Sequence, residues 1–111
     1  MSEYYLIDFG VNFANERRYP DLTLDKLMQD SWNGGVEKVV CISNSMKEAK
    51  RIITLKQKYE HMHYTLGVHP HHASEFKLED IAFIKSHAAD SKFFAIGECG
   101  LDYNRLEKDK Y

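Results

Sequence analysis

Short apolar runs alternate with longer amphipathic stretches along the whole sequence. The apolar runs lie at residues 4–9, 36–42, 63–68 and 93–97, and the stretches between them repeat their hydrophobic residues every three or four positions. Short runs rich in β-branched and aromatic residues are typical of buried strands, whereas a period near 3.6 is typical of helices. The pattern therefore predicts the element order β-α-β-α-β-α-β.

Three helices are expected between the strands, over residues 24–33, 46–59 and 78–89. Thr23 and Ser45 are placed to cap the first two, because a side-chain oxygen before a helix accepts hydrogen bonds from its free amides. The side chains expected to face inward are Leu24, Leu27, Met28 and Trp32, then Ala49, Ile52 and Ile53, then Leu78, Ile81 and Ala82, with Ile84 at the edge of the last stripe.

The alternation of strands and helices predicts an α/β fold with parallel strands and right-handed crossovers. Two architectures fit: a small open doubly wound sheet, or part of a TIM-type (β/α)₈ barrel, which takes about 250 residues. The sequence has 111 residues and ends soon after a polar strand end, where a fourth helix is expected to begin at residue 104. This favours a partial barrel. Its outer strands would lack neighbours, so self-association through the unpaired strand edges is also predicted.

Composition narrows the possible environments and partners. Fifteen basic and seventeen acidic residues give a net charge of -2, which argues against a protein that coats nucleic acid non-specifically. Cys41 and Cys99 lie beside apolar strands and fit buried free thiols in a reducing compartment. The sequence contains no apolar stretch long enough for a membrane span and no signal-peptide pattern, so a cytoplasmic location is expected.

Polar residues follow three of the predicted strands. The first strand leads to Asn12, the third to His69 and His71, and the fourth to Glu98. The carboxyl ends of parallel strands are where α/β folds place their chemistry. A carboxylate there suits a hard cation such as Mg²⁺, and the histidines suit a metal, a proton or a phosphate. The alternative is that Glu98 accepts loop amides and that the histidines cap the next helix or are solvated.

Two further features have a functional and a structural interpretation. Asp8 lies inside an apolar run, and a buried carboxylate needs a partner or a metal. Lys47, Lys50 and Arg51 form a basic patch on the second helix, which fits a solvated face as well as DNA. Asn12 has a similar ambiguity, because asparagine also serves as an ordinary turn residue.

Two motifs carry a resemblance to a known family. The segments Gly67-Val-His-Pro-His71 and Gly97-Glu-Cys-Gly-Leu-Asp-Tyr103 are separated by a helix, and with this pair the chain resembles the TatD family of metal-dependent deoxyribonucleases. That family has a full (β/α)₈ barrel. The resemblance covers nearly the whole chain and implies that residues 1–111 are a single TatD-like domain, somewhat less than the N-terminal half of the barrel. It implies hydrolysis of phosphodiester bonds in DNA with a divalent metal, for which Mg²⁺ is expected.

The resemblance also implies roles for individual residues. Glu98 matches a metal-ligand position, and Asp8 is a weaker metal candidate. His69 is expected to act with Asn12 in positioning the phosphate as catalytic residues, while His71 and Asp102 are expected to contact the substrate. Most members of the family have His-x-His where this chain has Gly10 and Asn12, which weakens metal binding from the first strand; a subset has the Gly-Val-Asn version.

The family's remaining ligands, two histidines and one aspartate on later strands, have no counterpart in these 111 residues. Three functions therefore stay open. The chain is part of a TatD-like nuclease, an inactive half-barrel that serves as a remnant or interaction protein, or another metal-dependent hydrolase on the same scaffold.

Overall fold

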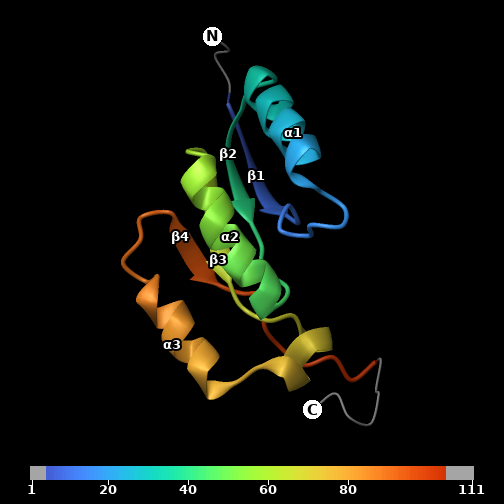
Figure 1. Ribbon diagram of the computed structural model, residues 1–111, viewed down its shortest axis with the longest axis vertical. Helices are drawn as coiled ribbons and strands as arrows, with labels where there is room; N and C mark the ends of the chain where they lie inside the picture. The colour runs from blue at the N-terminus through green and yellow to red at the C-terminus, as the bar shows by residue number, and fades with distance from the viewer. Residues whose placement is uncertain (1–4, 105–111) are drawn as a thin grey trace.

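Four parallel strands form a single sheet in the computed structural model, which describes residues 5–104 (Figure 1). The strands are β1 (Leu6–Val11), β2 (Val36–Cys41), β3 (Met62–Leu66) and β4 (Phe93–Ile96). The connections contain helices α1 (Asp21–Asn33), α2 (Met46–Lys58) and α3 (Leu78–Ser86), with a short 3₁₀ helix, η1 (Pro70–Glu75), ahead of α3. The strands lie in the order β1-β2-β3-β4, which confirms the predicted βαβαβαβ arrangement of an α/β fold.

The sheet is strongly curved. The ring of Phe9 on β1 lies 5.1 Å from the ring of Phe94 on β4, although β2 and β3 lie between these strands. Neighbouring strands are about 4.8 Å apart, so a flat sheet would hold β1 and β4 roughly 14 Å apart. The outer strands therefore bend toward each other, as in a segment of a TIM-type barrel, and the two phenylalanines lie on the concave face.

The hydrophobic core lies between this sheet and the helices. Met62, Tyr64 and Leu66 of β3 are completely buried in it, because alternate residues of a strand face the same side. The helices contribute four of the residues predicted to face inward, Leu24, Met28, Ala49 and Ile52, and also Ile84, which was predicted at the edge of its stripe. Ile53 is only partly buried.

The start of α1 differs from the prediction. The carbonyl oxygen of Pro20 accepts a hydrogen bond from the amide of Leu24 at 2.9 Å, so α1 begins at Asp21 with Pro20 as its N-cap, and not at the predicted cap Thr23. Ser45 does cap α2, since its side chain accepts a bond from the amide of Glu48 at 3.2 Å. Trp32 does not face inward; it is 45% exposed and stacks on the ring of His61.

The inward face of α3 was also predicted wrongly. Leu78 is 85% exposed and Ile81 39% exposed, and Ala82 is exposed as well. The buried residues are Ile84 and Asp80, whose carboxylate accepts a hydrogen bond from the amide of Lys77 at the helix start. Within the described residues no strand follows β4, so no further sheet covers Leu78, Ile81 and Ala82 of α3.

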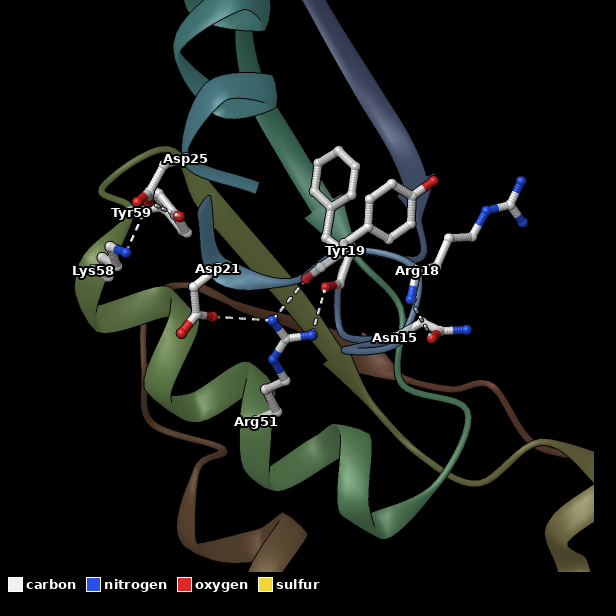
Figure 2. A network of polar contacts seen from close by, with 9 residues as sticks. Asn15, Arg18, Tyr19, Asp21, Asp25, Arg51, Lys58 and Tyr59 are labelled. Carbon is white, nitrogen blue, oxygen red and sulfur yellow. Dashed lines mark hydrogen bonds and ion pairs between the residues drawn. The ribbon is translucent and has the colours of Figure 1, made fainter. Parts of the chain in front are cut away.

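Two clusters of polar side chains connect segments that are distant in sequence. Asp90, in the connection between α3 and β4, accepts a hydrogen bond from the hydroxyl of Tyr64 at 2.7 Å and pairs with Lys56 of α2 at 2.8 Å. Asp25 of α1 forms a second cluster with Tyr59 and Lys58 at the end of α2 (Figure 2). The connections are thereby fixed to helices that lie far from them in sequence.

Three smaller expectations concern the thiols, the membrane and the C-terminal segment. Cys41 is buried as predicted, and burial raises the pKa of its thiol to about 11. Cys99 is exposed instead, because it lies in the loop after β4. Within residues 5–104, every helix is too short or too polar to traverse a bilayer. The fourth helix expected over residues 104–111 lies almost entirely outside the described residues.

Candidate functional site

The carboxyl ends of all four strands meet at one open depression of about 460 Å³. Asn12 follows β1, Asn44 follows β2, His69 follows β3 and Glu98 follows β4. The depression is lined by Asn12, Asn15, Arg18, Asn44, Glu48, His69, His71, His72 and Glu98. The structure thus brings together four of the predicted site residues, which come from distant parts of the sequence.

Backbone contacts place Glu98 at this edge. Its amide donates a hydrogen bond to the carbonyl oxygen of Ser43 at 3.2 Å, and the amide of Gly97 donates to Leu66 at 2.9 Å. Gly67 allows this close approach, because a Cβ atom there would lie 2.4 Å from the carbonyl oxygen of Glu98. The first glycine of one motif therefore makes room for the backbone of the other.

The side chain of Glu98 faces His69. Their Oε1 and Nε2 atoms are 3.3 Å apart, and the Glu98 side chain is 45% exposed. The Nδ1 atom of His69 accepts a hydrogen bond from the amide of His71 at 3.0 Å, so a neutral His69 carries its proton on Nε2, toward Glu98. Among the described residues, no backbone amide donates to the Glu98 carboxylate, which disfavours the alternative that it only satisfies loop amides.

His69 also shows that one structural alternative was partly correct. Its Nδ1 contact with the amide of His71 caps the start of η1, so the histidine has a local role besides facing Glu98.

A second histidine–carboxylate pair lies next to the first. The Nε2 atom of His71 is 2.8 Å from Oδ2 of Asp102, and the His69 and His71 rings meet edge to face with their centroids 4.5 Å apart. This pairing brings Asp102 beside the depression, although spacing alone did not single it out. His72 pairs with Glu75 at the exposed rim.

Four residues that line the depression were not predicted from the sequence: Asn15, Arg18, Asn44 and Glu48. The Nδ2 atom of Asn44 donates to Oδ1 of Asn12 and to Oε1 of Glu48, both at 3.2 Å. The carbonyl oxygen of Asn44 accepts a bond from the amide of His69 at 2.9 Å. A signal was present, because Ser43-Asn44-Ser45 follows β2 in the same way that the other site residues follow their strands.

The environment of Asp8 is not the one expected. Its side chain is exposed on the outer strand β1, not buried, and it makes no hydrogen bond or ion pair within the part of the chain that is described. It does not line the depression. The need for a partner, which rested on burial, therefore disappears, and metal binding by Asp8 stays a prediction.

The described residues fit only part of a metal site. Within residues 5–104 no group of three or more His, Cys, Asp or Glu side chains is close enough to surround an ion. Glu98 offers a half-exposed carboxylate toward the depression, which is the donor that a hard cation prefers. This set supplies one oxygen ligand and needs others to complete a coordination sphere.

The family assignment follows from comparison of the whole chain. The family model described as "TatD related DNase" matches residues 7–111. The chain belongs to the TatD family. Three curated proteins called "3'-5' ssDNA/RNA exonuclease TatD" are similar to it. The protein from Erwinia tasmaniensis is 34% identical over 105 residues, which are 94% of this chain and 40% of the relative. The one from Cronobacter sakazakii is 32% identical over 100 residues, 90% of this chain and 37% of the relative, and the one from Erwinia amylovora is 34% identical over 103 residues, 90% and 38%.

The chain spans about two-fifths of the length of the TatD proteins it matches. The family is metal-dependent, and both motifs of the TatD resemblance lie within the matched residues. The curved four-stranded sheet accordingly corresponds to part of a TIM-type barrel of the TatD family.

Proposed function

We propose that this chain forms the N-terminal part of a TatD-type (β/α)₈ barrel, as a single domain over residues 1–111, which hydrolyses phosphodiester bonds in DNA with the aid of a divalent cation. The observation that carries the proposal is the meeting of Asn12, Asn44, His69 and Glu98 from four consecutive strand ends in one depression. Barrel enzymes build their active sites at this face. The relatives' names indicate single-stranded DNA or RNA attacked from the 3' end as the substrate to test first.

Glu98 is the metal ligand in this proposal. Its oxygen donors favour Mg²⁺, which when bound would polarise a phosphodiester and activate a water molecule. His69 holds its Nε2 proton toward Glu98 and orients the carboxylate. Asn12 accepts a bond from Asn44 through Oδ1, so its Nδ2 atom is directed to a different partner and donates to a phosphate oxygen of the substrate. The His71–Asp102 pair contacts the substrate beside it.

An inactive half-barrel is the second candidate, and one observation favours it for the 111 residues alone. Because the described residues do not gather three metal-ligating side chains, this chain by itself should bind Mg²⁺ weakly and show little nuclease activity. A different metal-dependent hydrolase remains the third candidate, since a scaffold does not fix the substrate.

The test is a chimera that completes the barrel. This chain replaces the matched N-terminal two-fifths of the Erwinia tasmaniensis relative, and the product is assayed on a 5'-labelled single-stranded oligonucleotide with Mg²⁺ or with a chelator. Small esters and amides are assayed as alternative substrates, with and without the chelator. We expect shortening of the oligonucleotide from its 3' end that stops when the chelator is added, and no activity from the 111-residue chain alone.

Substitutions in the chimera then test the roles. Glu98→Gln keeps the shape but removes the charge that holds the cation, and should lower the rate by about a hundredfold or more. His69→Ala should lower the rate by about tenfold, because His69 contacts the Glu98 carboxylate and not the metal itself. Glu79→Gln, an exposed position on α3, is the matched control and should change nothing. Full activity of Glu98→Gln would refute the assignment of Glu98, and an inactive chimera that is folded and binds Mg²⁺ would support the half-barrel.

A further inference from the structure

The connection between β1 and α1 is held in place by Arg51 of α2. The Arg51 guanidinium donates to the carbonyl oxygens of Phe13 at 3.3 Å and Tyr19 at 2.9 Å, and pairs with the Asp21 carboxylate at 3.2 Å (Figure 2). The Arg51 side chain is only 13% exposed. Arg51 therefore does not belong to a solvated basic face, and it fixes both ends of the loop at residues 12–20.

The loop is also ordered from within. The rings of Phe13 and Tyr19 meet edge to face with their centroids 5.2 Å apart, and Ala14 is buried. Asn15 bridges the turn, since its carbonyl oxygen accepts from the amide of Tyr19 at 2.8 Å and its Oδ1 accepts from the amide of Arg18 at 3.1 Å (Figure 2). The backbone of Arg18 is thus fixed relative to the sheet.

The side chain of Arg18 has a different environment from its backbone. Arg18 is exposed and lines the same depression as Glu98 and His69. No carboxylate among residues 5–104 pairs with its guanidinium, whose described contact is the ring of Tyr19 at 6.0 Å. Figure 2 shows the Arg18 side chain extending away from the Arg51 cluster. A fixed backbone here presents an uncompensated positive charge at the rim of a site that also contains two glutamates.

We propose that Arg18 binds a backbone phosphate of a single-stranded nucleic acid in this depression, and that Arg51 positions it by holding the loop. The inference rests on the proposed function and names a residue that holds its substrate. A planar guanidinium matches the non-bridging oxygens of a phosphate with two parallel hydrogen bonds. Such a contact attracts a polyanion past Glu48 and Glu98, and because it touches no base it binds any sequence.

The experiment measures binding separately from hydrolysis. The full 111-residue chain is titrated against a fluorescent twelve-nucleotide oligothymidine in chelator, at salt concentrations from 20 to 200 mM. Each phosphate contact to a single strand contributes about 0.7 to the slope of log affinity against log salt. Arg18→Ala should raise Kd about tenfold at low salt and flatten this slope by about 0.7, while Arg18→Lys should keep the slope.

Arg17→Ala is the matched control, because it removes one positive charge from the neighbouring position of the same loop. It should change Kd less than twofold. Equal effects of Arg17→Ala and Arg18→Ala would mean a diffuse charge effect and would overturn the proposal. A wild-type chain that does not bind the oligonucleotide at 20 mM salt would overturn it as well.

The positioning role of Arg51 is tested by non-additivity. Arg51→Ala should raise Kd about threefold to fivefold, Arg51→Lys should recover part of that loss, and the double variant Arg18→Ala/Arg51→Ala should bind no more weakly than Arg18→Ala. Additive losses would show that Arg51 acts independently of Arg18 and would overturn this part. If Arg18 behaves as expected but the chimera hydrolyses nothing, the phosphate site stands and the proposed nuclease function fails.

Discussion

Gly67→Ala should damage the site through the backbone alone. A Cβ atom at this position would lie 2.4 Å from the carbonyl oxygen of Glu98 and 2.5 Å from the carbonyl carbon of Gly97, whereas ordinary contact begins near 3.4 Å. The end of β3 and the segment after β4 must therefore move apart by about 1 Å. Both atoms belong to the backbone, so no side-chain rotation relieves the overlap.

Two quantities follow from this displacement. Overpacking of this kind costs about 1–3 kcal/mol, and we expect a loss near the upper end in the free energy of unfolding because the contacts are rigid. A reactive group misplaced by about 1 Å costs about a hundredfold in rate. The first is measured by urea denaturation of the 111-residue chain, and the second by the rate of the chimera with the Erwinia tasmaniensis relative.

Gly35→Ala separates loss of stability from displacement of the site. Gly35 has a φ of +98°, so alanine is strained there, but no atom lies within 4 Å of the added Cβ. It precedes β2, at the end of the sheet away from Glu98. This variant should lose about 1–2 kcal/mol of stability and keep its rate. The reasoning is refuted if Gly67→Ala keeps both its stability and its rate, or if Gly35→Ala loses as much activity.

Two further predictions concern acid and self-association. The ammonium group of Lys56, the amide of Lys92 and the hydroxyl of Tyr64 hold the pKa of Asp90 below its usual range. The stabilisation from Asp90 is therefore fully present above its unfolded pKa of about 3.9 and is lost progressively as pH falls from there toward the lower pKa of the folded state. The difference in urea stability between the wild type and Asp90→Asn should therefore be smaller at pH 3 than at pH 6, and a gap that is unchanged at pH 3 would contradict this. The outer strands expose Ile7, Phe9, Phe94 and Ile96, each more than half exposed, so the 111-residue chain should self-associate on concentration. Light scattering should show a mass that rises with concentration, and a constant monomer mass would exclude it.

The strands could be predicted from the sequence because burial on the sheet leaves near-continuous apolar runs. The buried faces of the helices were harder to predict from the sequence. In α3 the residues Leu78, Ile81 and Ile84 follow at a three-residue spacing, so each side chain is rotated by about 60° from the one before it, and only the packing decides that Ile84 is inside. The start of α1 depended on a carbonyl of Pro20 that accepts a bond, which a search for side-chain caps does not detect.

The residues of the site also differ in how well the sequence predicts them. Glu98 and His69 could be found because each follows an apolar strand within a distinctive motif. Asn44 follows a strand without such a motif, and its role depends on contacts with Asn12 and the amide of His69 that arise only when the strands align. Arg18 lies in a polar loop with no periodicity, and its place at the rim depends on Arg51, thirty-three positions later in the sequence.

The order of the strands has a consequence for how the protein is made. Because β1, β2, β3 and β4 neighbour one another in the order in which they are translated, each of the strands β2, β3 and β4 finds a neighbour already synthesised when it emerges from the ribosome. Within residues 5–104, each strand–helix unit can therefore dock on the one before it. The sheet can therefore grow from the N-terminus in one direction while the rest of the chain is still being translated.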